Sequence, residues 1–270
     1  MLSLVVVEIV AGFLIALAIG ITGVGAGSIT APILILFFHQ SATDAVTTAL
    51  VFGTVVKLIA TPFYMARGQV KYKILGYLVL GGLPAVLAGS FLLQSMDKSR
   101  LTGPILLIVG ITVALSAGAT LWKNFSTAQS AVKPLALKWL PWIVAPIGLE
   151  VGFSSAGAGA LGTVVMMRFT SLLPAEVVGT DIAFGLVLSL FGGGVHASMN
   201  GIPWAILGQL LIGGVPAILI GTHLATVLSP RKMRVALCVW LIYIGGQLSY
   251  RSLTTPAPAP AKSAAFRPLK

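Results

Sequence analysis

The chain carries the stretch Gly81-Gly82-Leu83-Pro84-Ala85-Val86-Leu87 and repeats it almost unchanged as Gly213-Gly214-Val215-Pro216-Ala217-Ile218-Leu219. The offset is 132 residues, and the same offset places Gly25-Ala26-Gly27 on Gly157-Ala158-Gly159 without a gap. Other pairs keep this offset, namely Asp44 with Glu176, Thr48 with Thr180, Gly53 with Gly185, Gly76 with Gly208, and Gly89 with Gly221. A chance match would drift over this length, so the chain consists of two homologous halves, and residues related by this offset are called equivalent below.

The composition indicates a membrane protein. Hydrophobic residues make up 57% of the 270 residues, charged residues make up 9%, and the mean hydropathy is +1.02. So few charges cannot cover a water-soluble globule of this length. A duplicated apolar chain whose landmarks are interior glycines is typical of secondary transporters, in which the substrate site lies between two repeats.

Other classes of protein are excluded by the same counts. The net charge of +11 comes from bases that stand singly or in small groups between apolar runs, so they set membrane topology and do not form a nucleic-acid surface. The lone Cys238 allows no disulfide and no thiolate metal site. An enzyme is not expected, because the three histidines are scattered and the chain has no His-Glu-x-x-His and no Gly-x-Ser-x-Gly motif. No cofactor or metal is expected either.

Long apolar segments predict membrane-spanning helices at 4–21, 44–66, 72–95, 101–122, 138–153, 176–198, 204–228 and 233–250. Two shorter apolar segments, 28–38 and 160–170, each follow a glycine-rich cluster. At 1.5 Å per residue, such a segment reaches only about half of the hydrocarbon thickness. We predict that both are half-helices, each returning from a glycine-rich break inside the protein.

The predicted fold is an all-α polytopic membrane protein with two repeats, each a helical hairpin with a glycine-rich break followed by three transmembrane helices. The first repeat is 1–122, the second is 138–250, 123–137 is a linker loop and 251–270 is a disordered tail. An odd number of crossings per repeat requires that the two repeats are inverted. The loops 67–73, 123–138 and 231–234, with Arg168, hold most of the bases and are assigned to the cytoplasm, which places both termini in the periplasm.

The glycine-rich breaks predict an anion site. The first amides of a helix are unpaired and the helix dipole adds positive charge there, while glycine lets backbone approach a ligand. The residues assigned to this site are Thr22, Gly23, Gly25, Gly27 and Ser28 in the first half and Ser154, Ser155, Gly157 and Gly159 in the second. Close helix packing also uses small residues. The short helix after both breaks favours the anion site.

Ionisable residues within the spans are the candidates for substrate binding and coupling, because each costs about 2.5–3.5 kcal/mol at a helix centre on insertion scales. Lys57 lies near the middle of 44–66 and is predicted to face the anion path, snorkelling being the alternative. Asp181 is predicted to exchange protons or to pair with Lys57, or to complement a helix start. His196 and Glu150 are further coupling candidates, and a hydrogen-bonded wall residue and a water-facing carboxylate are the alternatives.

Three doubled motifs resemble a known family. The first is Gly-x-Gly-x-Gly before a short helix with an early proline, residues 23–32; the second is Asp44-Ala45-Val46-Thr47-Thr48 with Glu176-Val177-Val178-Gly179-Thr180; the third is Gly68-Gln69-Val70-Lys71-Tyr72 with Gly201-Ile202-Pro203-Trp204. In this order they resemble the sulfite exporter TauE/SafE family, also called the toluene sulfonate uptake permeases, over about residues 5–250. Thr48 and Thr180 are assigned to the substrate site on these motifs.

The resemblance implies a transporter that exports sulfite, thiosulfate or small organosulfonate anions across the bacterial inner membrane, and proton coupling through Asp181 is expected. An anion-selective channel is the alternative, since glycine amides also build selectivity filters. The oligomeric state stays open. Two departures make the halves unequal: Ser154-Ser155-Ala156-Gly157 replaces a full glycine run, and Val164 stands where the first half has Pro32.

Overall fold

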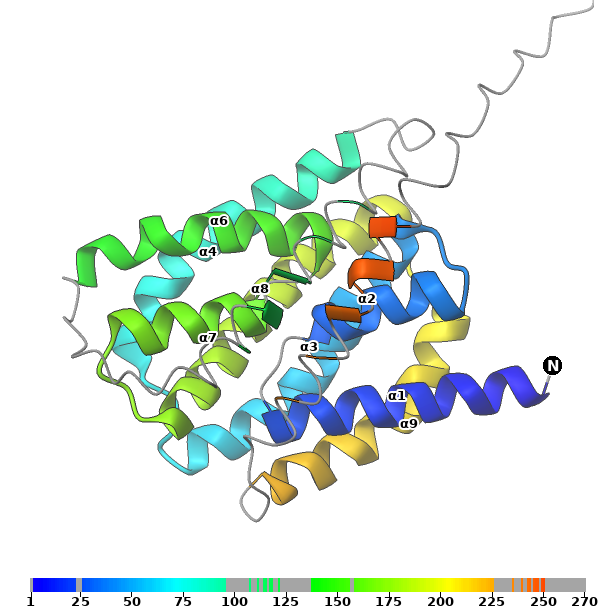
Figure 1. Ribbon diagram of the computed structural model, residues 1–270, viewed down its shortest axis with the longest axis horizontal. Coiled ribbons are helices and arrows are strands. Elements are labelled where there is room, and N and C mark those ends of the chain that lie inside the picture. Colours follow the sequence, from blue (N-terminus) through cyan, green and yellow to red (C-terminus); the bar gives the residue numbers. More distant parts are fainter. Residues whose placement is uncertain are drawn as a thin grey trace, which may run out of the picture.

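The structure is a computed structural model that describes residues 2–22, 26–95, 137–155 and 158–225, with scattered helical positions between 107 and 121 and between 235 and 250. The elements are α1 (Leu2–Thr22), α2 (Ala26–Phe37), α3 (Ala42–Ala66), α4 (Tyr72–Ser95), the short 3-10 helix η1 (Leu137–Trp139), α6 (Leu140–Ser154), α7 (Ala158–Phe169), α8 (Pro174–Asn200) and α9 (Trp204–Leu224). Figure 1 shows their order along the chain. The described part is all-helical, as expected.

Four helices are long and apolar enough to cross a membrane among the described residues: α3, α4, α8 and α9. Their bounds agree with the predicted spans 44–66, 72–95 and 176–198 to within two residues, and α9 begins at the predicted residue 204. The predicted spans 101–122 and 233–250, most of the linker 123–137 and the tail 251–270 lie outside the continuously described ranges.

The two short helices are present where the glycine clusters predict them. α2 and α7 each have 12 residues, so each is about 18 Å long against about 30 Å of hydrocarbon. α6 ends at Ser154, and its C-cap Ser155 has a left-handed backbone with φ 61° and ψ −5°. α2 and α7 are therefore half-helices by length.

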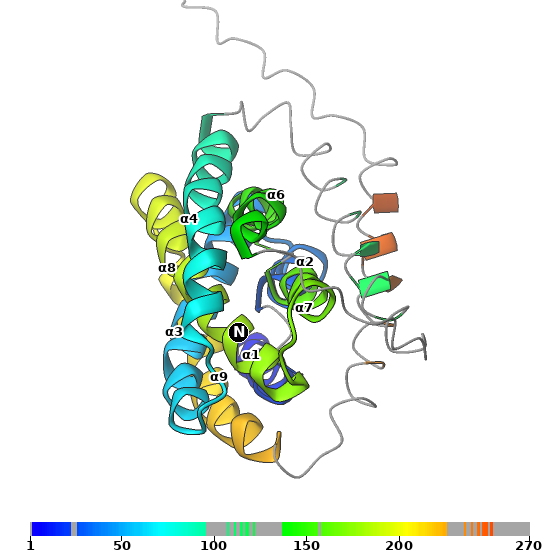
Figure 2. The same cartoon turned by 90° about the vertical axis from the view of Figure 1, so that its left-hand side faces the viewer.

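The helices form two layers. Figure 2 shows α3, α4, α8 and α9 in one layer and α1, α2, α6 and α7 in the other. Within this arrangement the repeats exchange partners, because α1 packs against α9 and α4 packs against α6. The first helix of each repeat therefore rests on a helix of the other repeat.

Glycines make these exchanged contacts possible, and they do so at equivalent positions. Gly81 lies against the Pro141 carbonyl, and its equivalent Gly213 lies against the Ile9 carbonyl, which is the equivalent of Pro141. A Cβ added to either glycine would collide with that backbone oxygen. Each repeat therefore contacts the other through the same glycine and the same backbone carbonyl.

The aromatic core repeats the same reciprocity. A Cβ built on Gly82 would lie 2.7 Å from the Phe184 ring, and one built on the equivalent Gly214 would lie 2.7 Å from the Phe52 ring. Both rings are fully buried. Each phenylalanine thus fills the space left by a glycine of the other repeat.

Equivalent helices α3 and α8 cross at the centre of the long-helix layer and run antiparallel. Gly193 of α8 lies on Leu50 of α3, whereas Gly185, further back along α8, lies on Lys57, further along α3. The starts of both helices are capped by acids, as the sequence indicates: Ser41 donates to Asp44 and caps its amide, and the Leu173 amide donates to Glu176.

The glycine contacts give a stability prediction with matched controls. Gly81→Ala and Gly213→Ala should each lower the melting temperature of the purified protein, because a methyl group against a rigid backbone carbonyl costs about 1–3 kcal/mol or more. Gly76→Ala and Gly208→Ala, in the same two helices, should be neutral or stabilising by up to about 1 kcal/mol, since their Cβ atoms meet open space. Equal melting temperatures for all four variants would contradict the reciprocal contact.

Candidate functional site

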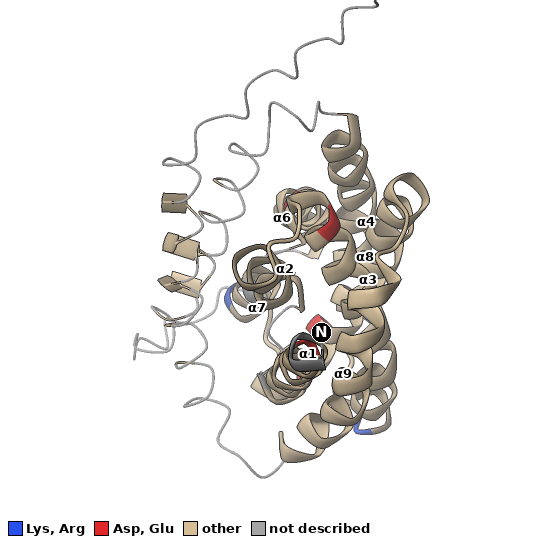
Figure 3. Cartoon of the chain, turned by 90° about the vertical axis from the view of Figure 1, so that its right-hand side faces the viewer, with Lys and Arg blue, Asp and Glu red and all other residues tan. Residues whose placement is uncertain are grey.

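Lys57 is a buried cation in the middle of the long-helix layer. Its side chain is 5% exposed, and a Cβ built on Gly185 of α8 would lie 2.6 Å from Nζ. The ammonium group therefore ends on the glycine face of the neighbouring helix, away from the helix ends that snorkelling would require. Charged residues are rare on the helices, as the few blue and red positions in Figure 3 show.

Asp181 supplies the opposite charge on the same face of α8, one turn before Gly185. Its side chain is 2% exposed, and its carboxylate attracts Lys57 electrostatically. No salt bridge or hydrogen bond from Lys57 Nζ to a described residue is present. The two charges share one site without forming a closed ion pair.

The half-helix α7 holds Asp181 in place. Thr163 donates from Oγ1 to Asp181 Oδ2 at 3.1 Å, and a Cβ built on Gly162 would lie 2.5 Å from Oδ1. The equivalents of Thr163 and Asp181 are Ala31 and Ala49, so the same helix contact in the first repeat is apolar. The site is therefore electrically asymmetric although the backbone around it is duplicated.

The half-helix α2 begins beside Lys57. Ala26, its first residue, lies on Gly53 of α3, where an added Cβ would come within 2.8 Å of the Ala26 Cβ. Gly53 precedes Lys57 by one turn and shares its helix face. The first amides of α2 and the positive end of its dipole therefore lie next to the buried ammonium. Ser28 in this first turn is fully buried, and its Oγ has no hydrogen-bond partner among the described residues.

The two glycine-rich breaks meet at Gly27. Its Cα faces the carbonyl and the hydroxyl of Ser155, so even a methyl group would collide with that residue. Packing against the second break is thus sufficient to require a glycine here, and the assignment of the Gly27 amide to the anion site stays a prediction. Gly23, Gly25 and Gly157 lie outside the described residues, and the surroundings of Thr22 and Gly159 are not described.

Several predicted site residues have local partners. Ser154 Oγ lies 2.8 Å from Glu150 Oε1 and 3.1 Å from the Glu150 carbonyl, so this hydroxyl is used within α6. Thr180 Oγ1 accepts from the Lys71 amide at 3.0 Å and donates to the Gln69 carbonyl at 3.5 Å. Thr180 therefore holds a loop of the other repeat, whereas its equivalent Thr48 is buried with no partner for Oγ1 among the described residues.

His196 is a hydrogen-bonded wall residue in this structure. Nε2 lies 2.9 Å from the Gly152 carbonyl, which can only accept, and Nδ1 lies 3.0 Å from Gln94 Nε2. The equivalent contact in the first repeat joins the Tyr64 hydroxyl to the Gly20 carbonyl at 3.0 Å. Since a phenol serves as well as an imidazole at this position, the geometry favours the structural alternative over a proton relay.

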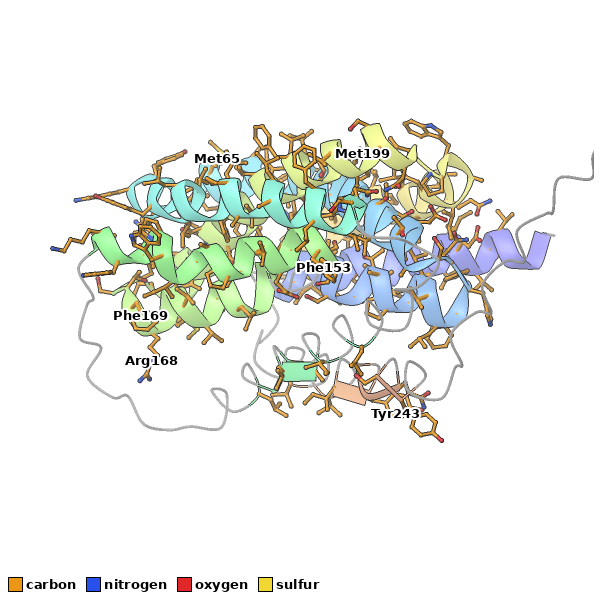
Figure 4. All side chains as sticks on the ribbon, turned by 90° about the horizontal axis from the view of Figure 1, so that it is seen from above. Met65, Phe153, Arg168, Phe169, Met199 and Tyr243 are labelled. Atoms are coloured by element: carbon orange, nitrogen blue, oxygen red, sulfur yellow. The ribbon has the colours of Figure 1, made fainter. Side chains whose placement is uncertain are left out.

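Arg168 does not join the site. Figure 4 shows the Arg168 side chain pointing away from the helices at the end of α7. The described residues contain no group of three His, Cys, Asp or Glu side chains that could hold a metal ion. The residues brought together are Lys57 and Asp181 with the start of α2 and the second turn of α7. Sequence reasoning missed Thr163 and Gly162, whose only signal is the short helix that folds back onto Asp181.

Comparisons with known proteins identify a family and two relatives. The profile of the sulfite exporter TauE/SafE family matches residues 8–248. A Bacillus subtilis protein named probable membrane transporter protein YjnA is 27% identical over 251 residues, covering 89% of this chain and 98% of its own length. A probable membrane transporter protein of Xylella fastidiosa is 26% identical over 241 residues, covering 84% of this chain and 87% of its own. No solved structure matches the chain significantly.

The hydrogen bonds of His196 give a testable distinction between structure and coupling. His196→Phe should lower the free energy of unfolding by about 1–3 kcal/mol, because the Gly152 carbonyl and the Gln94 amide lose a buried partner. His196→Gln keeps an amide donor and removes the titratable ring, so transport by this variant should keep the pH dependence of the parent protein. Loss of that pH dependence in His196→Gln, measured in vesicles, would show that His196 takes part in proton coupling.

Proposed function

Because the chain belongs to the sulfite exporter TauE/SafE family, we propose that it exports sulfite, thiosulfate or a small organosulfonate across the bacterial inner membrane. Family and relatives make it a membrane transporter and not an enzyme. The substrate anion binds between the starts of the two half-helices, against Lys57.

The observation that carries this proposal is the burial of Lys57. An ammonium group at 5% exposure in the middle of a membrane helix is unfavourable unless an anion or a set of dipoles compensates it. Asp181 supplies one negative charge, which balances the Lys57 ammonium. The positive end of the α2 dipole points toward the same site, so the site still attracts a further anion. The buried Ser28 hydroxyl, which has no partner among the described residues, adds a donor for a substrate oxygen.

An inverted arrangement of the repeats fits this site. Reciprocal contacts between α1 and α9 and between α4 and α6 support a twofold relation, and the antiparallel crossing of the equivalent helices α3 and α8 supports an axis in the membrane plane. Both termini then lie on the same side of the membrane, and the basic loops assigned to the cytoplasm make that side the periplasm. A cysteine added at the N-terminus should react with a membrane-impermeant maleimide in spheroplasts, and protection there would reverse the orientation.

The two buried charges give a route to proton coupling. In the empty site Asp181 compensates the Lys57 ammonium. An entering anion takes over that role, and the carboxylate, left in a low-dielectric site beside a second negative charge, takes up a proton. The proton and the anion then move together, and each is released when the other leaves.

Lys57→Met should abolish most substrate-induced thermal stabilisation, because the variant removes the fixed positive charge and keeps the length of the side chain. The measurement is a thermal-shift series with sulfite, thiosulfate, sulfate, taurine and sulfoacetate on purified protein. Arg168→Met is the matched control, since it removes a positive charge on an exposed side chain at the end of α7. Undiminished anion binding by Lys57→Met would make the lysine structural and the proposed site wrong.

Asp181→Asn should keep anion binding and lose the pH dependence of transport. The amide keeps a carbonyl oxygen for the Thr163 hydroxyl and cannot take up a proton. Uptake of labelled anion into vesicles at several pH values tests this, and counterflow of labelled substrate in the same vesicles distinguishes a carrier from a channel. A pH profile identical to that of the parent protein would remove Asp181 from coupling.

A further inference from the structure

The loop between α3 and α4, residues 67–71, ties the first repeat to the second, and we call it the strap. Arg67 Nη1 donates to the Thr222 carbonyl near the end of α9 at 3.1 Å. Lys71 Nζ lies 2.8 Å from Glu176 Oε1 at the start of α8. The strap thus holds two helices of the other repeat, each by a charged group.

The middle of the strap is fixed to α8 through backbone groups. The Gln69 carbonyl and the Lys71 amide both bond to Thr180 Oγ1, at 3.5 Å and 3.0 Å. The Gln69 carbonyl also lies against Gly179, where an added Cβ would come within 2.7 Å of it. Val70 is only 5% exposed as a result. Since Asp181 follows Thr180 directly, the strap fixes the helical turn that carries the buried carboxylate.

The equivalent loop, residues 201–203, cannot make these contacts. Pro203 stands where the strap has Lys71, so that position has neither an amide hydrogen nor an ammonium group. Thr47 stands where α8 has Gly179, and a side chain at that position would collide with a carbonyl placed as that of Gln69 is. In agreement, the buried Thr48 Oγ1 has no partner among the described residues, although its equivalent Thr180 has two.

We propose that the strap is a gate. It keeps one end of the transporter closed by clasping the start of α8, whereas the loop at the other end, residues 201–203, cannot make these contacts. Opening of the strap end requires release of Thr180 and of the Lys71 to Glu176 ion pair. This release frees the α8 turn that holds Asp181, which links the gate to the buried charges.

The first test measures opening directly and needs no known substrate. In a Cys238→Ser background, Val70→Cys puts a thiol at the buried position of the strap. The rate at which maleimide labels this thiol reports opening of the strap. Adding Thr180→Val removes both hydrogen bonds without changing charge and should raise that rate about fivefold or more. Thr48→Val, the equivalent change at the other end, should leave the rate unchanged. Equal rates with Thr180→Val and Thr48→Val would overturn the gate.

The second test locks the strap. A Cβ built on Gly179 lies 2.9 Å from the Gln69 Cβ and 2.7 Å from the Gln69 carbonyl oxygen, so Gln69→Cys with Gly179→Cys can form a disulfide once the strap backbone moves back by about 1 Å. The reduced double variant is the control for that shift. The oxidised protein should keep anion-induced thermal stabilisation and lose transport, and a reductant should restore it. Unimpaired transport after oxidation, or loss of binding, would overturn the gate. If neither the reduced variant nor the parent protein transports any of the anions named above, the proposed substrate is wrong. The maleimide labelling rates of the first test then still decide whether the strap is a gate.

Discussion

Direct contact between glycines of one repeat and backbone carbonyls of the other is the constraint on which the architecture depends. At Gly81 on Pro141 and at Gly213 on Ile9 no side chain separates the two helices. In a bilayer, where no hydrophobic driving force holds helices together, such close approach supplies the dispersion contacts that do so. The half-helices α2 and α7 are too short to hold themselves in the membrane, and this frame positions them.

The duplication is kept in packing and broken in charge. Gly82 with Phe184 and Gly214 with Phe52 make the same contact twice. Lys57, by contrast, has Ser189 as its equivalent, and Asp181 has Ala49. Packing positions must suit both copies of one backbone, whereas the proposed site between the repeats needs each charge only once. A second lysine and a second aspartate would put like charges side by side, at a large cost in low dielectric.

The sequence predicted what depends on composition and on the offset between the halves. The described spans, the two short helices and the burial of Lys57 all follow from local apolar length and from the duplication. Contacts between segments distant in the chain were not predictable in this way. The close contact of Gly27 with Ser155, the bond from Thr163 to Asp181 and the bonds of His196 to Gly152 and Gln94 depend on how α2, α7 and α4 fold back, which no periodicity encodes. A glycine that packs and a glycine that binds look the same in a sequence.

The exchange of partner helices also determines the order in which the protein can be built. α1 leaves the ribosome well before its partner α9, because most of both repeats separates Ile9 from Gly213, which packs against it. Until α9 is inserted, the glycine-lined face of α1 has only lipid or an insertion factor to rest against. α1 is therefore among the last of these helices to reach its final neighbours, and a truncated chain that stops before α9 leaves it without its principal support.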